Sequence, residues 1–207
     1  MFYTPRMSTV RSRRDQFSAA TRAALLDAAT RRFADHGFAG TTLEDVAADI
    51  QATRGAVYHH FASKKALFEA VFEKLETEVM AAAAAAGARG TDPWSRAILA
   101  LDTFLERCCD PGYGRIVWEE GAVTLGVSEW MVLEEKYAYG LVEGYVRDLI
   151  EGGLIESLPI EATVNIAFHL LGAAGQALAR APEDTKRDVM ADYRTVILKM
   201  LAGLAVR

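Results

Sequence analysis

Apolar residues recur along this chain at helical spacing, and no stretch alternates polar and apolar residues as a strand would. Between residues 18 and 38, Leu25, Ala29 and Phe33 lie four residues apart, which places them on one face of a helix. The chain has 207 residues, of which 51% are hydrophobic, enough for one or two globular domains with a core. With five prolines in that length, the chain is predicted to fold as an all-α protein.

Helix caps and breaks divide this pattern into about nine helices. Gly37 is placed to end the first helix, and Thr42 opens the second with an S/T-x-x-D/E capping pattern. Thr53 and Ser63 are suited to cap the third and fourth helices. The predicted helices span about residues 18–37, 43–50, 53–61, 64–86, 93–109, 113–124, 128–152, 160–180 and 183–205.

The charge of the chain is divided unevenly along its length. Residues 1–65 contain ten Lys or Arg against six Asp or Glu, whereas the remaining 142 residues contain thirteen against twenty-two. The net charge of the whole chain is -5. A basic N-terminal third on an acidic body indicates that one end of the molecule meets a polyanion such as nucleic acid. The alternative is an unevenly charged, solvated surface with no partner.

The second and third predicted helices are separated by a short turn, a spacing typical of a helix-turn-helix. Ala47 is small enough to let the two helices approach closely. Val57 and Phe61 lie four residues apart and are expected to anchor the third helix to the core. In such motifs the second helix of the pair enters the major groove of DNA. The residues left facing outward are Arg54, Gly55, Tyr58 and His59.

Two stretches between residues 21 and 72 read ALLDAATRRFADHGFAGTTLEDVAADI and TRGAVYHHFASKKALFEAVF. The second stretch contains the arrangement G-x-x-Y-x-H-F-x-S-K-x-x-L, which is far longer than a chance motif. Over these residues the chain strongly resembles the tetracycline-repressor (TetR) family of bacterial transcriptional regulators. The resemblance implies a helix-turn-helix DNA-binding domain here and a variable helical domain after about residue 90.

The resemblance implies DNA contacts at eight positions. It places Thr42 and Tyr58 on phosphates, and Lys64 on a further phosphate at the start of the fourth helix. It places the N-terminal part of the third helix at base edges, where an Arg can bond a guanine through two hydrogen bonds. Tyr58 could instead cover the domain surface. The candidate DNA-binding residues are Thr42, Thr53, Arg54, Gly55, Ala56, Tyr58, His59 and Lys64.

Gln51 departs from the family pattern. Family members commonly carry glycine in this turn, where a left-handed backbone is convenient. A Gln in that conformation would cost about 1 kcal/mol, or the turn would be slightly altered.

The resemblance also implies two domains, with the helix at 64–86 bridging them. Residues 1–66 would form a basic arm and the helix-turn-helix, and residues 67–207 a helical domain for effector binding and dimerisation. The helices at 160–180 and 183–205 would pack against their copies in the four-helix bundle of a homodimer. Their apolar stripes are equally compatible with an ordinary core.

Aromatic residues gather on the helices that would enclose the family's ligand cavity, which fits an apolar or aromatic small-molecule effector. Each of them could instead belong to the core, and a His on an apolar stretch is more often a core histidine. Glu119 or Glu120 could recognise a cationic effector, or both could face solvent. The candidate ligand-binding residues are Phe104, Cys108, Trp118, Trp130, Tyr137, Phe168 and His169.

The sequence predicts no enzyme, no cofactor and no metal site, because catalytic motifs and metal-ligand spacings are missing. The adjacent Cys108 and Cys109 cannot form the framework of a secreted domain, although a thiol switch stays an alternative. A cytoplasmic protein without a membrane partner is expected, since neither a signal peptide nor a span of about 20 apolar residues is visible. Met1 and Met7 are both possible start residues.

The leading prediction is therefore a homodimeric regulator, most often a repressor in this family, that binds a palindromic DNA operator and responds to a small molecule. One alternative is a small-molecule-binding protein or enzyme with an incidental helix-turn-helix. Another is a protein that coats DNA without regard to sequence, which the overall acidity disfavours.

Overall fold

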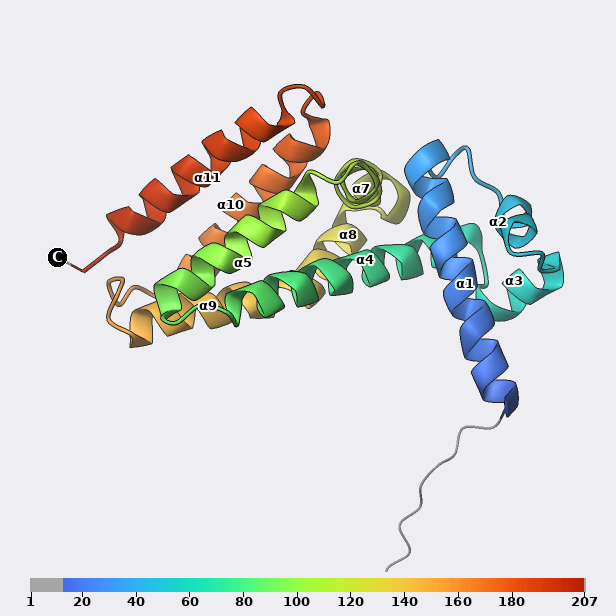
Figure 1. Ribbon diagram of the computed structural model, residues 1–207, viewed down its shortest axis with the longest axis horizontal. Helices are drawn as coiled ribbons and strands as arrows, with labels where there is room; N and C mark the ends of the chain where they lie inside the picture. The colour runs from blue at the N-terminus through green and yellow to red at the C-terminus, as the bar shows by residue number, and fades with distance from the viewer. Residues whose placement is uncertain (1–12, 207) are drawn as a thin grey trace, which may run out of the picture.

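The computed structural model describes residues 13–206, which form helices joined by short loops. Figure 1 shows a small head made of the first three helices and a larger helical body, with α4 running between them. The prediction of an all-α fold is confirmed for the described residues, which add one isolated β-bridge between Ile155 and Ala205. The basic residues Arg6 and Arg11 of the predicted arm lie outside the described residues, as do Met1 and Met7.

The head is built around aromatic side chains from α1 and α4. Its helices are α1 (Arg13–His36), α2 (Leu43–Asp49) and α3 (Arg54–His60), followed by the connecting helix α4 (Lys64–Gly87). Phe33 of α1 is fully buried against Phe68 of α4, with ring centroids 5.2 Å apart, and Phe38 packs on Phe68 at 5.4 Å. Because Phe68 belongs to this core, α4 serves both parts of the molecule, and a domain limit between residues 66 and 67 stays a prediction.

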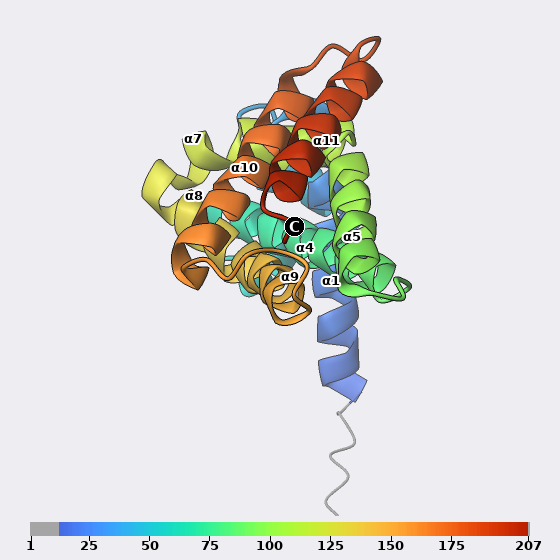
Figure 2. The same ribbon diagram turned by 90° about the vertical axis from the view of Figure 1, so that its left-hand side faces the viewer.

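The body contains the remaining helices, two of which widen into π-helical turns. Their bounds are α5 (Pro93–Cys108), α6 (Pro111–Tyr113), η1 (Gly114–Glu119), α7 (Gly121–Leu125), α8 (Val127–Glu134), η2 (Glu135–Tyr139), α9 (Gly140–Glu151), α10 (Ile160–Arg180) and α11 (Lys186–Gly203). In Figure 2, α10 and α11 lie side by side on the face turned toward the viewer.

The nine predicted helices correspond to ten continuous helical stretches among the described residues, because the helix predicted at 113–124 is broken at Glu120, and there are three further differences. The first begins at Arg13, five residues before the predicted start. Those predicted at 113–124 and 128–152 are each interrupted by a π-helical turn, which apolar periodicity does not reveal. The last begins at Lys186 because residues 182–185 form a turn, in which Thr185 N donates to Pro182 O at 3.1 Å.

Candidate functional site

Local capping bonds fix the start of α2 and α3. Thr42 accepts a hydrogen bond from Asp45 N, and Asp45 in turn accepts from Thr42 N, so the predicted capping box is present. Thr53 accepts from Ala56 N at 3.2 Å and caps α3. Between them Gln51 adopts a left-handed backbone with φ of 54°, so the turn keeps the conformation that a glycine would give it.

One face of α3 is anchored and the other is open to solvent. Val57 and Phe61 are buried in the core cluster, as their spacing predicted. Figure 1 shows that the outward side of α3 lies at the end of the molecule farthest from α11. The exposed residues of α3 are Arg54, Gly55, Tyr58 and His59, while Ala56 and His60 are half-buried.

Arg54 and Tyr58 form a small exposed cluster on α3. Arg54 Nη2 donates to Tyr58 Oη at 3.3 Å, and its guanidinium lies 5.3 Å from the centre of the tyrosine ring. Arg54 Nε also pairs with Glu44 Oε1 of α2 at 2.9 Å. The hydrogen bond with Tyr58, and then the charge of Glu44, raise the pKa of the guanidinium further. Because these contacts are exposed, each contributes little free energy. They orient the guanidinium, and little free energy is lost when it leaves them.

Lys64 has a different environment from the other candidate DNA-binding residues. Its Nζ donates to the carbonyl oxygens of Phe38 at 2.7 Å and Thr41 at 3.0 Å, and lies 4.2 Å from the centre of the Phe38 ring. An ammonium group has three donors, so one remains for an outside partner. Lys64 therefore holds the loop between α1 and α2 against α4, a structural role that the sequence did not reveal.

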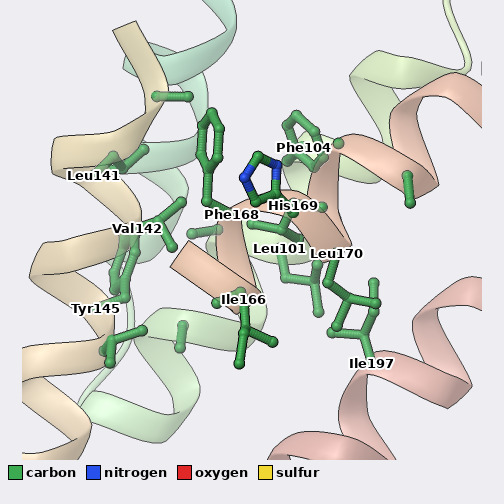
Figure 3. A pocket seen from close by; sticks show the side chains of 18 of the residues that line it. Leu101, Phe104, Leu141, Val142, Tyr145, Ile166, Phe168, His169, Leu170 and Ile197 are labelled. Carbon is green, nitrogen blue, oxygen red and sulfur yellow. The ribbon is translucent and has the colours of Figure 1, made fainter. Parts of the chain in front are cut away.

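The body contains a cavity of about 540 Å³ between α4, α5, η1, α8, η2, α9, α10 and α11. Figure 3 shows Phe168 and His169 of α10 reaching between the neighbouring helices, opposite Leu141 and Val142 of α9. Most of the lining is aliphatic or aromatic, and the volume is within the range of small-molecule sites.

Five of the seven candidate ligand-binding residues line this cavity, and ligand contact by them stays a prediction. They are Phe104, Trp118, Trp130, Phe168 and His169. Trp118 and Trp130 pack edge to face with ring centroids 6.1 Å apart, and Trp130 Nε1 donates to Val117 O at 3.1 Å. His169 is exposed at the cavity edge, where the sequence had favoured a core position.

Cys108 and Tyr137 do not line the cavity, which corrects their placement on its wall. Cys108 lies one turn beyond Phe104 and is fully buried in the core cluster, and burial raises the pKa of its thiol well above the usual value. A protonated, buried thiol gives no support to a thiol switch. Tyr137 points toward α4, where it hydrogen-bonds with Glu73 and lies under Lys136.

Three acidic residues of the cavity wall were missed by the sequence analysis, of which Glu76 and Glu134 are buried and Glu135 is exposed. Glu76 of α4 and Glu134 of α8 line the cavity, whereas Glu119 and Glu120 do not. A signal was present in the sequence, because Glu76 lies four residues after Phe72 on an otherwise apolar stripe of its helix. Glu134 likewise lies four residues after Trp130.

Glu120 instead connects the body to the head. Its Oε2 accepts from Phe38 N at 2.6 Å, and its Oε1 accepts from Arg115 Nε at 3.1 Å. Arg115 Nη1 donates to the last carbonyl groups of α1, those of Ala34 and Asp35, each at 3.0 Å. Gly37, with φ of 71°, ends α1 as predicted, and a Cβ there would collide with both side chains. The segment that carries Trp118 is thereby bonded to the end of α1.

Comparison with known proteins agrees with this architecture. Residues 25–71 match the model of the bacterial regulatory proteins of the tetR family, and residues 94–204 match the tetracyclin repressor-like C-terminal domain. The crystal structure of a TetR-family transcriptional regulator from Pectobacterium atrosepticum is similar, with a TM-score of 0.81 and 26% sequence identity. The similarity covers 95% of this chain and 99% of that one.

Curated relatives show the same likeness, mainly in the head. The chain is 48% identical over 48 residues to the probable acrEF/envCD operon repressor of Escherichia coli strain K12, which is 23% of this chain and 22% of that protein. The chain thus spans about a fifth of the length of that relative. The transposon Tn10 TetC protein of Escherichia coli is 23% identical over 180 residues, or 85% of this chain and 90% of that one. Since family models match both the head and most of the body, the chain belongs to the tetR family of bacterial regulatory proteins.

Proposed function

We propose that this chain is a homodimeric transcriptional repressor that binds a palindromic operator through α3 and responds to a small molecule in its cavity. The observation that carries the proposal is the bonded path from Trp118 on the cavity wall, through Arg115 and Glu120, to the end of α1. This path gives the cavity a physical connection to the helix-turn-helix. The proposal includes no catalytic step and a cytoplasmic location, as suits a family of DNA-binding regulators.

The exposed side of α3 supports major-groove binding. Arg54, with Gly55, Ala56 and His59, is proposed to meet base edges, where a guanidinium can bond guanine at two atoms. Tyr58 is proposed to bond a phosphate. Thr42, Thr53 and Lys64 would approach phosphates from the helix starts, with Lys64 using the donor that its bonds to the loop leave free.

Exposed apolar residues on α10 and α11 support dimerisation through these helices. Val196 of α11 is 53% exposed, and Ile166 of α10 and Met200 of α11, which also border the cavity, are 64% and 50% exposed. By length and composition alone α10 could also cross a membrane. We infer that a second copy covers this face, because a two-fold pairing places two α3 helices on the successive major grooves of a palindrome, about 34 to 36 Å apart.

Effector binding is proposed to alter that spacing. Suppose that η1 can take two positions and that a ligand packs better against Trp118 in one of them. The ligand then favours that position of η1, and with it the matching position of Arg115 and α1. The coupling free energy is the difference in ligand affinity between the two arrangements.

The proposal is tested by selecting duplexes from a random DNA pool with the purified protein and sequencing the bound fraction. A recurrent palindrome is expected from the wild type. Arg54→Ala should lose most of the affinity for it, while Arg89→Ala, an exposed arginine after α4, should retain it. An unenriched pool, or equal binding by Arg54→Ala and wild type, would contradict the proposed interface.

A further inference from the structure

Two buried carboxyl groups line the apolar cavity. Glu76 is 1% exposed and Glu134 is 6% exposed, and both line the cavity. Glu76 Oε1 accepts from Tyr113 Oη at 2.5 Å, whereas Glu76 Oε2 and Glu134 Oε1 are buried without a hydrogen-bond partner among the described residues. Within residues 16–206, no Lys, Arg or His forms an ion pair with either carboxyl group.

Two buried carboxyl groups lower the stability of the folded protein. An ionised carboxylate loses its hydration on burial, and two carboxylates in one site repel each other. Burial raises the pKa of Glu76 to about 7, although the hydrogen bond from Tyr113 acts in the opposite direction. Burial, and then the nearby charge of Glu76, raise the pKa of Glu134 well above its usual value. Apolar residues at both positions would give a more stable core, so the pair needs a reason outside the fold.

The rest of the lining defines what such a pair can bind. Among the described residues the lining contains a third acid, Glu135, and no Lys or Arg. An anionic ligand would therefore meet repulsion from three acids, and the one basic side chain of the described lining is His169 at the exposed edge. Trp118 and Trp130 also line the cavity, and the faces of tryptophan rings attract cations.

We propose that the effector is a hydrophobic cation, an apolar body carrying one ammonium group that is held between Glu76 and Glu134. This inference rests on the proposed function of the cavity as the effector site, and it replaces the apolar or aromatic effector that the sequence predicted. The ammonium group donates to the two oxygens that have no partner within the protein, and its positive charge favours the ionised carboxylates, so the carboxyl groups release their protons to solvent as it binds. The aliphatic and aromatic walls of Figure 3 hold the apolar body.

The direct test uses three probes with one apolar body and different end groups: 4-phenylbutylamine, 4-phenylbutanol and 4-phenylbutyrate. Binding to the full-length protein without DNA is followed by tryptophan fluorescence, since Trp118 and Trp130 line the cavity, and by calorimetry. At pH 8 the amine is expected to bind at least about tenfold more tightly than the alcohol, and the carboxylate more weakly than both. Equal affinity for amine and alcohol, tighter binding of the carboxylate, or no binding of the amine at 1 mM would overturn the proposal.

Matched variants assign the selectivity to the pair. Glu76→Gln and Glu134→Gln should each lower the affinity for the amine about tenfold and leave the affinity for the alcohol within about twofold. Glu151→Gln makes the same change on an exposed position at the end of α9 and should alter neither affinity. Equal losses for amine and alcohol, or amine binding unchanged in both single variants, would overturn the role of the pair.

The result is independent of the DNA experiment. A palindrome recovered from the random pool together with no preference for the amine would leave the regulator in place and reject the cationic effector. Amine selectivity in a protein that enriches no DNA would support the site and reject the regulatory function.

Discussion

Gln51 illustrates how one residue can be strained without changing the fold around it. Its φ of 54° lies in the left-handed region, which a side chain with a Cβ adopts at a cost. The sequence identified the position as one for glycine, and the structure shows that the turn is kept and the residue is strained. The strain is compensated by the bonds on either side, such as that from Ala52 N to Ala47 O at 2.9 Å.

We expect Gln51→Gly to raise the free energy of unfolding by about 1 kcal/mol, because glycine adopts this conformation without a steric penalty. Urea denaturation followed by circular dichroism measures the change. Gln51→Ala keeps a Cβ and should stay within about 0.5 kcal/mol of the wild type. A destabilised Gln51→Gly variant would show that the glutamine side chain makes a compensating contact.

Glu76 gives a prediction with a defined sign in pH. Its pKa is raised from 4.5 to about 7, so between these values the folded protein holds a proton that the unfolded chain releases. Stability is therefore lost as the pH rises from about 4.5 through 7. The other titratable groups that face Glu76 are Glu134, Tyr113 and Cys108, none of which is basic.

Glu76→Gln should accordingly stabilise the protein by about 2 to 3 kcal/mol at pH 8 and by much less at pH 5. The amide oxygen can still accept the hydrogen bond from Tyr113, so the comparison isolates the charge. Thermal unfolding at the two pH values measures the difference. An equal shift in Tm at both would mean that the carboxyl group titrates normally.

At the scale of elements, α3 contains a glycine that the fold itself does not require. A Cβ on Gly55 would have Thr53 Oγ1 at 3.8 Å as its nearest neighbour, which is ordinary contact. Glycine within a helix is less stable than alanine, so the residue is explained better by something that approaches from outside. Because Gly55 is exposed on the proposed DNA-facing side, we propose that the operator backbone or a base edge approaches it there.

Gly55→Ala is thus expected to raise the free energy of unfolding by about 0.5 to 1 kcal/mol and to weaken operator binding at least about tenfold. Gly144→Ala provides the control, because it makes the same change at an open, exposed position of α9. Denaturation and fluorescence anisotropy with the selected duplex measure the two effects. Unchanged operator affinity in Gly55→Ala would remove Gly55 from the interface.

At the scale of the whole molecule, α10 and α11 present exposed apolar residues that we explain by the proposed dimer. Val196 and Met200 of α11 are half exposed, although each belongs to the apolar stripe of a long helix. A two-fold axis pairs a surface patch with the same patch on a second copy. Such a face can therefore be buried without a second, complementary surface elsewhere in the chain.

Val196→Glu should convert a dimer into a monomer, because it places two carboxylates opposite each other near the proposed two-fold axis. Sedimentation velocity at micromolar concentration measures the state directly. Val123→Glu carries the same change on α7, at a position that is 85% exposed, and should leave the dimer intact. A monomeric wild type, or a dimeric Val196→Glu variant, would place any interface elsewhere.

Local chemistry made the helices of the head predictable from the sequence. Thr42, Thr53 and Ser63 each cap a helix as their position indicated, since a cap needs only a side-chain oxygen and the amide groups two or three residues ahead. Apolar spacing located the anchors Val57 and Phe61 for the same reason, because helical periodicity depends on neighbours within one turn.

Only the tertiary structure decided the contacts between segments distant in the chain. The bonds of Arg115 and Glu120 to residues about 80 positions away depend on how the head meets the body, and periodicity carries no such information. The same holds for Lys64, which the family resemblance placed on DNA and which the fold bonds to a loop, and for Glu76 and Glu134, which the fold brings to one cavity. The sequence by itself determined most of the helices and the family, since both depend on local pattern, while the acidic residues of the cavity come from helices that only the fold brings together.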